Sequence, residues 1–142
     1  MQLSPRQITA IVCVIDIALH GQSRAQSSKL IASRAKINRR YLEQIMQPLV
    51  KAGIVQSIRG PQGGYQLARE RRSISIAEII SCVNEPASYS MCGQNPACQI
   101  TDRLIDDLRD QAHSWLRSVT VHDLCTDHTS KEDSQVPVHF SI

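Results

Sequence analysis

One stretch, residues 37–67, constrains the fold more than any other part of the chain, and it reads INRRYLEQIMQPLVKAGIVQSIRGPQGGYQL. Residues 39–52 carry apolar side chains at helical spacing and leave Arg39 and Arg40 on the opposite side, which predicts a cationic amphipathic helix. Gly53 is a typical helix-ending residue, and the two short runs after it are separated by a tip rich in glycine, so they predict a β-hairpin. A basic helix followed at once by a hairpin is the arrangement of a recognition helix and a wing.

The segment before this stretch predicts a long buried helix. Ser4, Pro5 and Gln7 form a capping-box pattern, so the helix should cover residues 5–20. Its apolar residues occupy two faces rather than one, which is typical of a helix that is covered on both sides. We expect one face to pack in its own domain and the other to meet a second structure such as a partner subunit.

A helix-turn-helix is predicted between residues 27 and 52. Ser27 and Ser28 can cap a short helix that ends near residue 34, and Asn38 is a suitable N-cap for the recognition helix. Two helices joined by a tight turn, the second basic on its outer side, are the pattern of a DNA-binding helix-turn-helix. Pro48 should kink the second helix or require local compensation, because it has no N–H to donate.

The remaining chain predicts three further regions. A second capping box at residues 75–78 opens a helix, and residues 84–99 lose periodicity and read as a loop. Apolar residues then recur at helical spacing through residues 100–119, and such a stripe outside the winged domain most economically packs against a copy of itself. The expected organisation is a winged helix-turn-helix domain (1–83), a cysteine-containing sensor loop (84–99), a dimerisation helix with a short terminal helix (100–125) and a disordered tail (126–142).

Charge is divided sharply along the chain. Residues 21–72 hold eleven Lys and Arg against two acids, whereas residues 73–142 hold four against ten. This split indicates that the first half binds a polyanion, and the acidic second half indicates that residues 73–142 have a different function.

No signal peptide or membrane span is visible, so we expect a cytoplasmic protein whose five cysteines are reduced thiols or metal ligands. Motifs of enzymes are not found either: the GPQGG tip lacks the GK[ST] ending and the following helix of a phosphate loop. We therefore expect a binding protein and not an enzyme.

The recognition helix and the wing contain the chemistry that DNA binding requires. Arg39 and Arg40 lie in the first helical turn, where the helix N-terminus also favours phosphate. Glu43 and Gln44, one turn later, can reach base edges, and the Glu43 carboxylate would repel an acceptor such as guanine O6. In the wing, glycines allow the backbone to approach phosphates, and Arg59 can enter a minor groove.

The segments RRYLEQIMQPLVKAGIVQSIRGPQGGYQLARE and ISIAEIISCVNEP resemble the Rrf2 family of bacterial transcription regulators, in particular its iron–sulfur regulators of the IscR type. The resemblance covers residues 1–124. It implies a mainly α fold with a small β-hairpin, in which a homodimer places two winged helix-turn-helix domains on double-stranded DNA and the long C-terminal helices cross between subunits. The DNA-contacting residues that we predict are Ser28, Asn38, Arg39, Arg40, Tyr41, Glu43, Gln44, Arg59, Gly60, Pro61, Gly63, Gly64 and Tyr65.

The resemblance also implies an iron–sulfur cluster, most simply [2Fe-2S], held in the loop before the long helix. Relatives carry three cysteines there, whereas this chain has only CGQNPAC, with Cys92 and Cys98. Two thiolates are not four ligands. The further ligands that we consider are Cys13, Cys82 and His113, with Cys13 favoured because some relatives use a side chain of the first helix from the other subunit.

Two alternatives stay open at this point. In the first, Cys92 and Cys98 act as a thiol redox pair without a cluster, or Cys13 bridges two subunits. In the second, the winged helix is a protein–protein adaptor and does not bind DNA. Burial in a core is the simplest role for Cys13 and Cys82, and Cys125 lies at a predicted helix end without further indication.

Overall fold

Helix α1, Pro5–His20, lies at the centre of the fold. It begins at the predicted capping box, where Ser4 Oγ accepts from the Gln7 N–H at 3.2 Å and Gln7 Oε1 accepts from the Ser4 N–H at 2.9 Å. One of its two apolar faces is buried through Ala10, Cys13, Val14 and Ile17. The other face stays open to solvent in the single chain, where Ile8 is 49% and Val12 43% exposed. The computed structural model describes residues 3–22, 24–83 and 95–140, and the side chains among these as far as residue 131.

The helix-turn-helix consists of α2, Ser28–Ala35, and α3, Arg39–Lys51. Lys36 closes α2 in the left-handed conformation at φ 56°, and Asn38 caps α3 as predicted, with its side chain accepting from the Tyr41 N–H at 2.7 Å. Helix α3 continues through Pro48, and the Ala52 N–H donates to the Pro48 carbonyl at the helix end. The tight turn and the two caps therefore fix where the recognition helix begins.

The wing is an antiparallel hairpin of β1, Val55–Ile58, and β2, Gly64–Leu67, in which Ser57 pairs with Tyr65 and Ile58 with Gly64. Gln26, in the connection between α1 and α2, forms an additional antiparallel bridge with Tyr65. Two backbone hydrogen bonds of 2.8 Å make this bridge. The base of the wing is thus attached to the segment that enters the helix-turn-helix.

A one-turn 3-10 helix η1, Arg71–Ser73, leads to α4, Ile76–Cys82, which opens with the second predicted capping box. The core lies between α1, α3 and α4. It is aliphatic, as expected for a chain that contains only one Phe and one Trp. Its largest fully buried side chains include Ile17, Ile31, Leu42, Ile45, Met46, Leu49, Ile54, Ile74 and Ile79.

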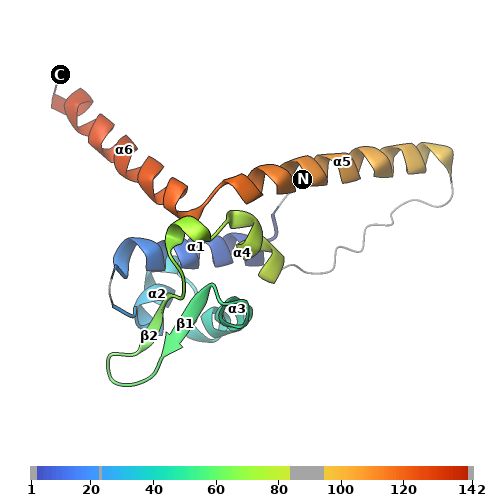
Figure 1. The fold of residues 1–142 in the computed structure, drawn as a ribbon. Coiled ribbons are helices and arrows are strands. Elements are labelled where there is room, and N and C mark those ends of the chain that lie inside the picture. Colours follow the sequence, from blue (N-terminus) through green and yellow to red (C-terminus); the bar gives the residue numbers. More distant parts are fainter. Residues whose placement is uncertain (1–2, 23, 84–94, 141–142) are drawn as a thin grey trace.

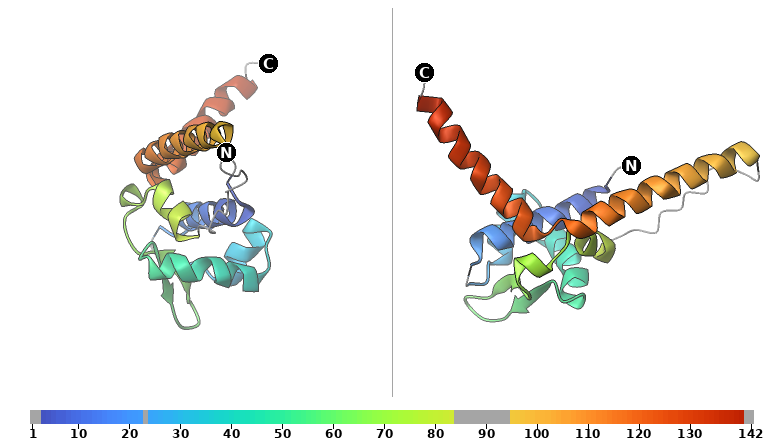
Figure 2. Two further views of the ribbon diagram at one scale, coloured as in Figure 1. Left: turned by 90° about the vertical axis from the view of Figure 1, so that its right-hand side faces the viewer. Right: turned by 45° about the horizontal axis from the view of Figure 1, so that its top comes forward.

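Helices α5, Pro96–Ser118, and α6, Val121–Phe140, extend away from this core. Both lie on the side of the winged domain that is opposite the hairpin (Figure 1), and the two further views agree (Figure 2). Their junction is fastened to the start of α4, since the Ile76 N–H donates to the Val119 carbonyl at 2.9 Å and the Val121 N–H to the Ile74 carbonyl at 3.0 Å. No helix of the described residues is long and apolar enough to cross a membrane.

Two element boundaries differ from the prediction. Helix α5 begins at Pro96 because Asn95 caps it, accepting from the Ala97 N–H at 3.0 Å, so Cys98 lies in the first helical turn instead of in the loop. Helix α6 continues to Phe140, beyond the predicted end of the terminal helix at residue 125 and through most of the segment expected to be disordered. Thr120 caps it in a reciprocal arrangement with Asp123, and Val121 and Cys125 hold its first turns in the core.

Candidate nucleic-acid interface

The outer side of α3 presents the predicted base-reading and phosphate-binding residues to solvent. Asn38, Arg39, Arg40, Glu43 and Gln44 are all exposed. They can stay exposed because the opposite side of the helix is anchored by its buried apolar residues, Leu42, Ile45, Met46 and Leu49. Arg39 and Arg40 stand at the helix N-terminus, where free N–H groups and the helix dipole add to their attraction for phosphate.

Ser28 and Arg39 lie together, although eleven positions separate them. The Arg39 Nε donates to Ser28 Oγ at 3.1 Å, which joins the first turn of α2 to the first turn of α3. A phosphate placed here would meet two helix N-termini together with a guanidinium and a hydroxyl. Tyr41, two residues after Arg39, is half-buried and packs against the core, so it helps to anchor the first turn of α3.

The wing tip is exposed at Arg59, Gly60 and Pro61. Gly60 has φ 117°, a conformation that side-chain-bearing residues rarely adopt, and its carbonyl accepts from the Gly63 N–H at 2.9 Å to close the turn. Arg59 thus projects from a short, closed loop, which is the form needed to enter a groove.

Gly63 and Gly64 have an internal reason to be glycine. A Cβ at Gly63 would overlap the carbonyl oxygen of Ile58, and a Cβ at Gly64 would overlap the carbonyl of Gln26. These overlaps are with backbone atoms, which cannot rotate aside. The second half of the GPQGGY motif therefore seats the wing against the preceding segment, whether or not it also approaches DNA.

Tyr65 connects the wing to the recognition helix electrostatically. The side chain is half-buried, and burial together with the negative charge of Glu43 raises the pKa of its hydroxyl, while the Arg39 guanidinium lowers it. Such mutual influence requires that the three groups lie near one another. The structure thus brings Arg39 and Glu43 of α3 within electrostatic range of Tyr65 in β2.

The four cysteines that the structure describes are spread over the fold and are not gathered at one site. Cys13 is fully buried in α1, and burial together with the charge of Asp16 raises the pKa of its thiol to about 12. Cys125 is buried in α6, and burial raises the pKa of its thiol too. Cys98 is partly exposed in α5, and Cys92 lies outside the described residues.

Cys82 and His113 line one cavity of about 290 Å³ between α4 and α5, together with Glu78 and Arg117. Burial and the nearby Glu78 raise the pKa of the Cys82 thiol, which favours the neutral form. His113 follows Cys98 by fifteen positions on the same helix, which corresponds to about 22 Å along the axis. Among the described residues, no group of three or more His, Cys, Asp or Glu side chains is placed to hold a metal ion.

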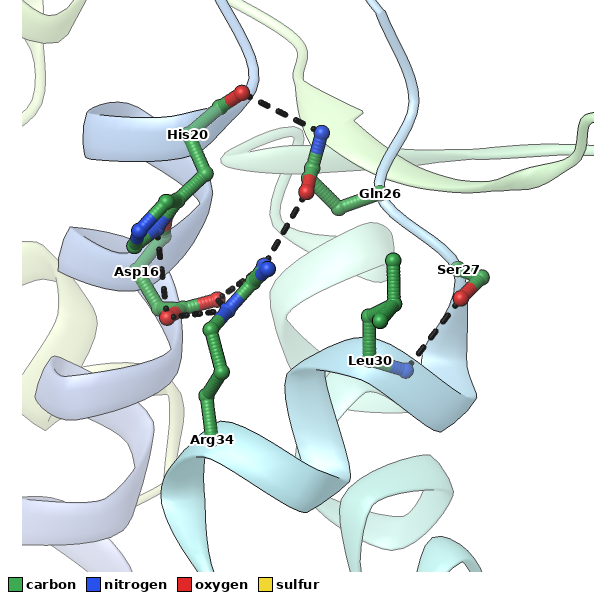
Figure 3. A network of polar contacts seen from close by, with 6 residues as sticks. All are labelled: Asp16, His20, Gln26, Ser27, Leu30 and Arg34. Carbon is green, nitrogen blue, oxygen red and sulfur yellow. Dashed lines mark hydrogen bonds and ion pairs between the residues drawn. The ribbon is translucent and has the colours of Figure 1, made fainter.

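Sequence patterns did not reveal a polar network that joins α1, α2 and the wing. Asp16 binds Arg34 in a bidentate ion pair, and Gln26 extends the contact (Figure 3). One signal for it existed in the sequence: Asp16 is the single acid of α1 and lies within the apolar run from Ala10 to Leu19, and a charge in such a position normally requires a partner. The pattern gave no indication of which residue that partner is.

Comparison with known proteins gives a consistent result for nearly the whole chain. The profile of the Rrf2 family, described as iron-dependent transcriptional regulators, matches residues 3–127. The transcriptional regulator IscR of Vibrio parahaemolyticus is 34% identical over 139 residues, which span 94% of this chain and 83% of that protein. A regulator described as ORF2 from Azotobacter vinelandii is 36% identical over 129 residues, or 87% and 79% of the two chains.

Solved structures show the same fold. The structure of T. potens IscR superimposes with a TM-score of 0.75 at 30% identity and covers 90% of this chain and 88% of that one. CymR of B. subtilis, described as a global cysteine regulator, gives a TM-score of 0.74 at 31% identity, with 89% and 97% covered. The expected fold, mainly helical with a winged helix-turn-helix and a long C-terminal helix, is thereby confirmed.

Proposed function

The chain belongs to the Rrf2 family of DNA-binding transcriptional regulators, which are not enzymes, and we propose that it binds an operator as a homodimer through α3 and the wing. The observation that carries this proposal is that Arg39 and Glu43, on the exposed side of α3, lie within electrostatic range of Tyr65 in the wing strand β2. On this surface the arginines neutralise phosphates, and Glu43 and Gln44 read base edges in the major groove. Arg59 enters the adjacent minor groove.

The basic half of the chain provides the electrostatic attraction for this contact. Residues 21–72 hold eleven Lys and Arg and only two acids, and this half forms the helix-turn-helix and the wing. Neutralising phosphates releases condensed counterions, so the affinity should fall steeply as salt rises. In this proposal, Ser28 and Asn38 contact the phosphate backbone of DNA beside Arg39. Gly60 and Pro61 bring the wing tip close to the same DNA.

Dimerisation is supported by what α5 leaves uncovered. None of its residues is buried in the single chain, yet Ile100, Leu104, Leu108 and Trp115 lie along one side and are 55–69% exposed. The open face of α1, with Ile8 and Val12, is a second apolar surface. A second copy of the chain covers both most economically, because a twofold interface uses the same surface twice and presents two recognition helices to two half-sites.

Titration of a labelled duplex tests the DNA contact. The duplex is enriched from a random-sequence library by the wild-type chain, and anisotropy is recorded between 50 and 300 mM salt. We expect affinity to fall linearly on a double-logarithmic plot, with Arg59→Ala weaker at every salt concentration. Arg109→Ala, on α5, is the matched control and should leave affinity nearly unchanged. A wild-type chain without salt-dependent binding would instead indicate the protein–protein adaptor.

Control by an iron–sulfur cluster at Cys92 and Cys98 is a finer part of the proposal and rests on the IscR relatives and on the description of the family as iron-dependent. The described residues of one chain do not fit a cluster. Cys13 is buried with a raised pKa, and His113 lies about 22 Å along α5 from Cys98. A cluster that uses Cys98 therefore needs Cys92 and donors from outside this set, such as a second chain, so we assign no regulatory step to it.

The cluster-free alternative needs only the two thiols, and one solved neighbour, CymR of Staphylococcus aureus, is described as an oxidized form. Two measurements distinguish the alternatives. Anaerobic reconstitution with iron and sulfide should give visible absorption and bound iron that Cys98→Ala removes, if a cluster forms. A colourless, iron-free protein whose Cys92 and Cys98 become linked after peroxide treatment, detected on a non-reducing gel, supports thiol control.

A further inference from the structure

Three parts of the winged domain converge on one polar network at the end of α1. Asp16, in α1, accepts from Arg34 of α2 through three contacts: Nε to Oδ1 at 2.9 Å, Nε to Oδ2 at 3.1 Å and Nη2 to Oδ2 at 2.8 Å. The Asp16 side chain is only 11% exposed. A bidentate arginine–carboxylate pair fixes direction as well as distance, so α1 and α2 are held in one relative orientation.

Gln26 connects this ion pair to the wing. Its Oε1 accepts from the Arg34 Nη2 at 3.0 Å, and its Nε2 donates to the His20 carbonyl at 3.2 Å, as Figure 3 shows. The backbone of the same residue pairs with Tyr65 in β2 through two hydrogen bonds of 2.8 Å. The two side-chain hydrogen bonds of Gln26 thus orient its backbone, which pairs with Tyr65 of the wing.

The fit at this point is close. Gly64 approaches the Gln26 carbonyl so nearly that a Cβ there would overlap it. A change in the position of Gln26 should therefore also move β2, because the two backbones are in close contact. Arg59, at the tip of the same hairpin, is the side chain whose reach into a groove would change.

The network also borders the open face of α1. Asp16 lies one helical turn after Val12 and one turn before Leu19, and both of these apolar side chains are more than a third exposed. A partner subunit that covers this face would thus touch the helix beside the ion pair. The position of the wing is linked to the surface where the proposed dimer forms.

We propose that Asp16, Arg34 and Gln26 are positioning residues that hold the base of the wing against α1 and α2, so that the contribution of Arg59 to DNA binding depends on them. This inference rests on the proposed DNA-binding function. None of the three touches DNA in it; they act through the Gln26–Tyr65 bridge.

The test compares the effect of Arg59→Ala in different backgrounds. Arg34→Lys keeps the charge but loses the fork that binds Asp16 and Gln26 together. Gln26→Ala changes no charge at all. We expect Arg59→Ala to weaken binding to the enriched duplex about tenfold in the wild type and less than about threefold in either variant.

Arg109→Lys is the matched control, because it makes the same substitution at an ion pair on α5, 3.7 Å from Asp106. In this background the tenfold effect of Arg59→Ala should persist. A general loss of stability would weaken binding by the same factor with and without Arg59, and that result overturns the inference. If the wild type itself does not bind DNA, the proposed function has failed instead.

Amide hydrogen exchange decides the matter for any variant that binds too weakly to titrate. In Arg34→Lys, the amides of Gln26 and Tyr65 should exchange at least about tenfold faster, whereas those of α4 keep their rates. Unchanged protection of the Tyr65 amide would contradict the proposal. Asp16→Asn gives a second check: it removes one negative charge, which by itself strengthens DNA binding, while the inference expects the contribution of Arg59 to fall.

Discussion

Helices α3 and α5 are both amphipathic, yet α3 buries four of its thirteen residues, whereas none of the twenty-three residues of α5 is buried. The apolar side of α3 is covered by the chain's own core, and its polar side faces outward with arginines. Within the described part of the chain, the apolar side of α5 stays largely exposed at Ile100, Leu104, Leu108 and Trp115. The winged half thus covers the apolar side of its recognition helix by itself, whereas α5 leaves an apolar side open that the proposed second chain would cover.

The two regions also differ in charge and in how they are attached. The winged half carries the excess of Lys and Arg, and α5 and α6 lie on the far side from the hairpin with an excess of acids (Figure 2). Two backbone hydrogen bonds fasten the α5–α6 junction to α4. A regulator with this layout can direct its positive surface to DNA while its acidic helices stay away from it.

The largest effect that we expect comes from matched leucine substitutions in the two regions. Leu42→Ala, at a fully buried position of α3, should lower the free energy of unfolding by about 2–5 kcal/mol, because it removes packing and leaves a cavity. Leu108→Ala, at a position 55% exposed in the single chain, should cost less, by an amount that shrinks on dilution. Denaturation at two protein concentrations measures both. Equal, concentration-independent losses would show that α5 is not covered by a partner.

A charge on the open side of α5 is the next strongest perturbation. Leu108→Asp should dissociate the proposed dimer and, because each half-site then binds alone, weaken operator binding by at least about tenfold. Sedimentation velocity gives the oligomeric state, and anisotropy gives the affinity. Ser114→Asp adds the same charge on a different side of the helix and should leave the dimer intact. A monomeric wild type would remove the basis for this prediction and for the proposed interface.

Local patterns predicted the winged half well because its elements are defined by neighbouring residues. The caps at Ser4, Asn38 and Ser75 form as predicted, and the glycine-rich tip gives the hairpin. Contacts between distant residues were beyond such patterns. Asp16 and Arg34 are eighteen positions apart, and only the packing of α1 against α2 brings them together.

The candidate metal site shows the same limit. Spacing alone allowed Cys98 and His113 to share a ligand set, but the continuous helix from Pro96 places them about 22 Å apart along its axis. Cys13 was predicted to be either buried or a ligand, and the structure buries it. Which ligands hold a cluster stays a prediction, because Cys92 lies outside the described residues.

The pH dependence of stability tests the burial of the Cys13 thiol in the winged core, in contrast to Cys98, which is partly exposed at the start of α5. The Cys13 pKa is raised from 9.0 to about 12, so its neutral form is favoured in the folded state. The contribution of the neutral Cys13 thiol to the free energy of unfolding is fully present below pH 9, and it is lost as the pH rises toward 12. Between pH 8 and pH 10 the loss should be about 1.4 kcal/mol, because the unfolded thiol ionises first. Cys13→Ala should lack this part of the pH dependence in urea denaturation, and identical slopes in the two proteins would contradict the burial of the thiol.

The smallest effect concerns the acids of α5 and tests whether the two regions are electrostatically separate. Asp102→Asn with Asp110→Asn removes two exposed negative charges, both turned away from the apolar side of the helix. Because α5 lies on the side of the winged domain opposite the hairpin (Figure 1), salt screens its charges from the proposed DNA contact at α3, so non-specific affinity should rise only about twofold to threefold at 50 mM salt. The increase should vanish at 300 mM.

Glu70→Gln is the sharper comparison, since this exposed acid lies within the basic half, just after β2. One charge removed there should raise affinity at least as much as two removed from α5, because the Coulomb energy falls with distance and with screening. Anisotropy with a random-sequence duplex measures both variants under the same conditions. If the α5 variant had the larger effect per charge, the acidic helices would have to lie beside the DNA, and the separation of the two regions would be wrong.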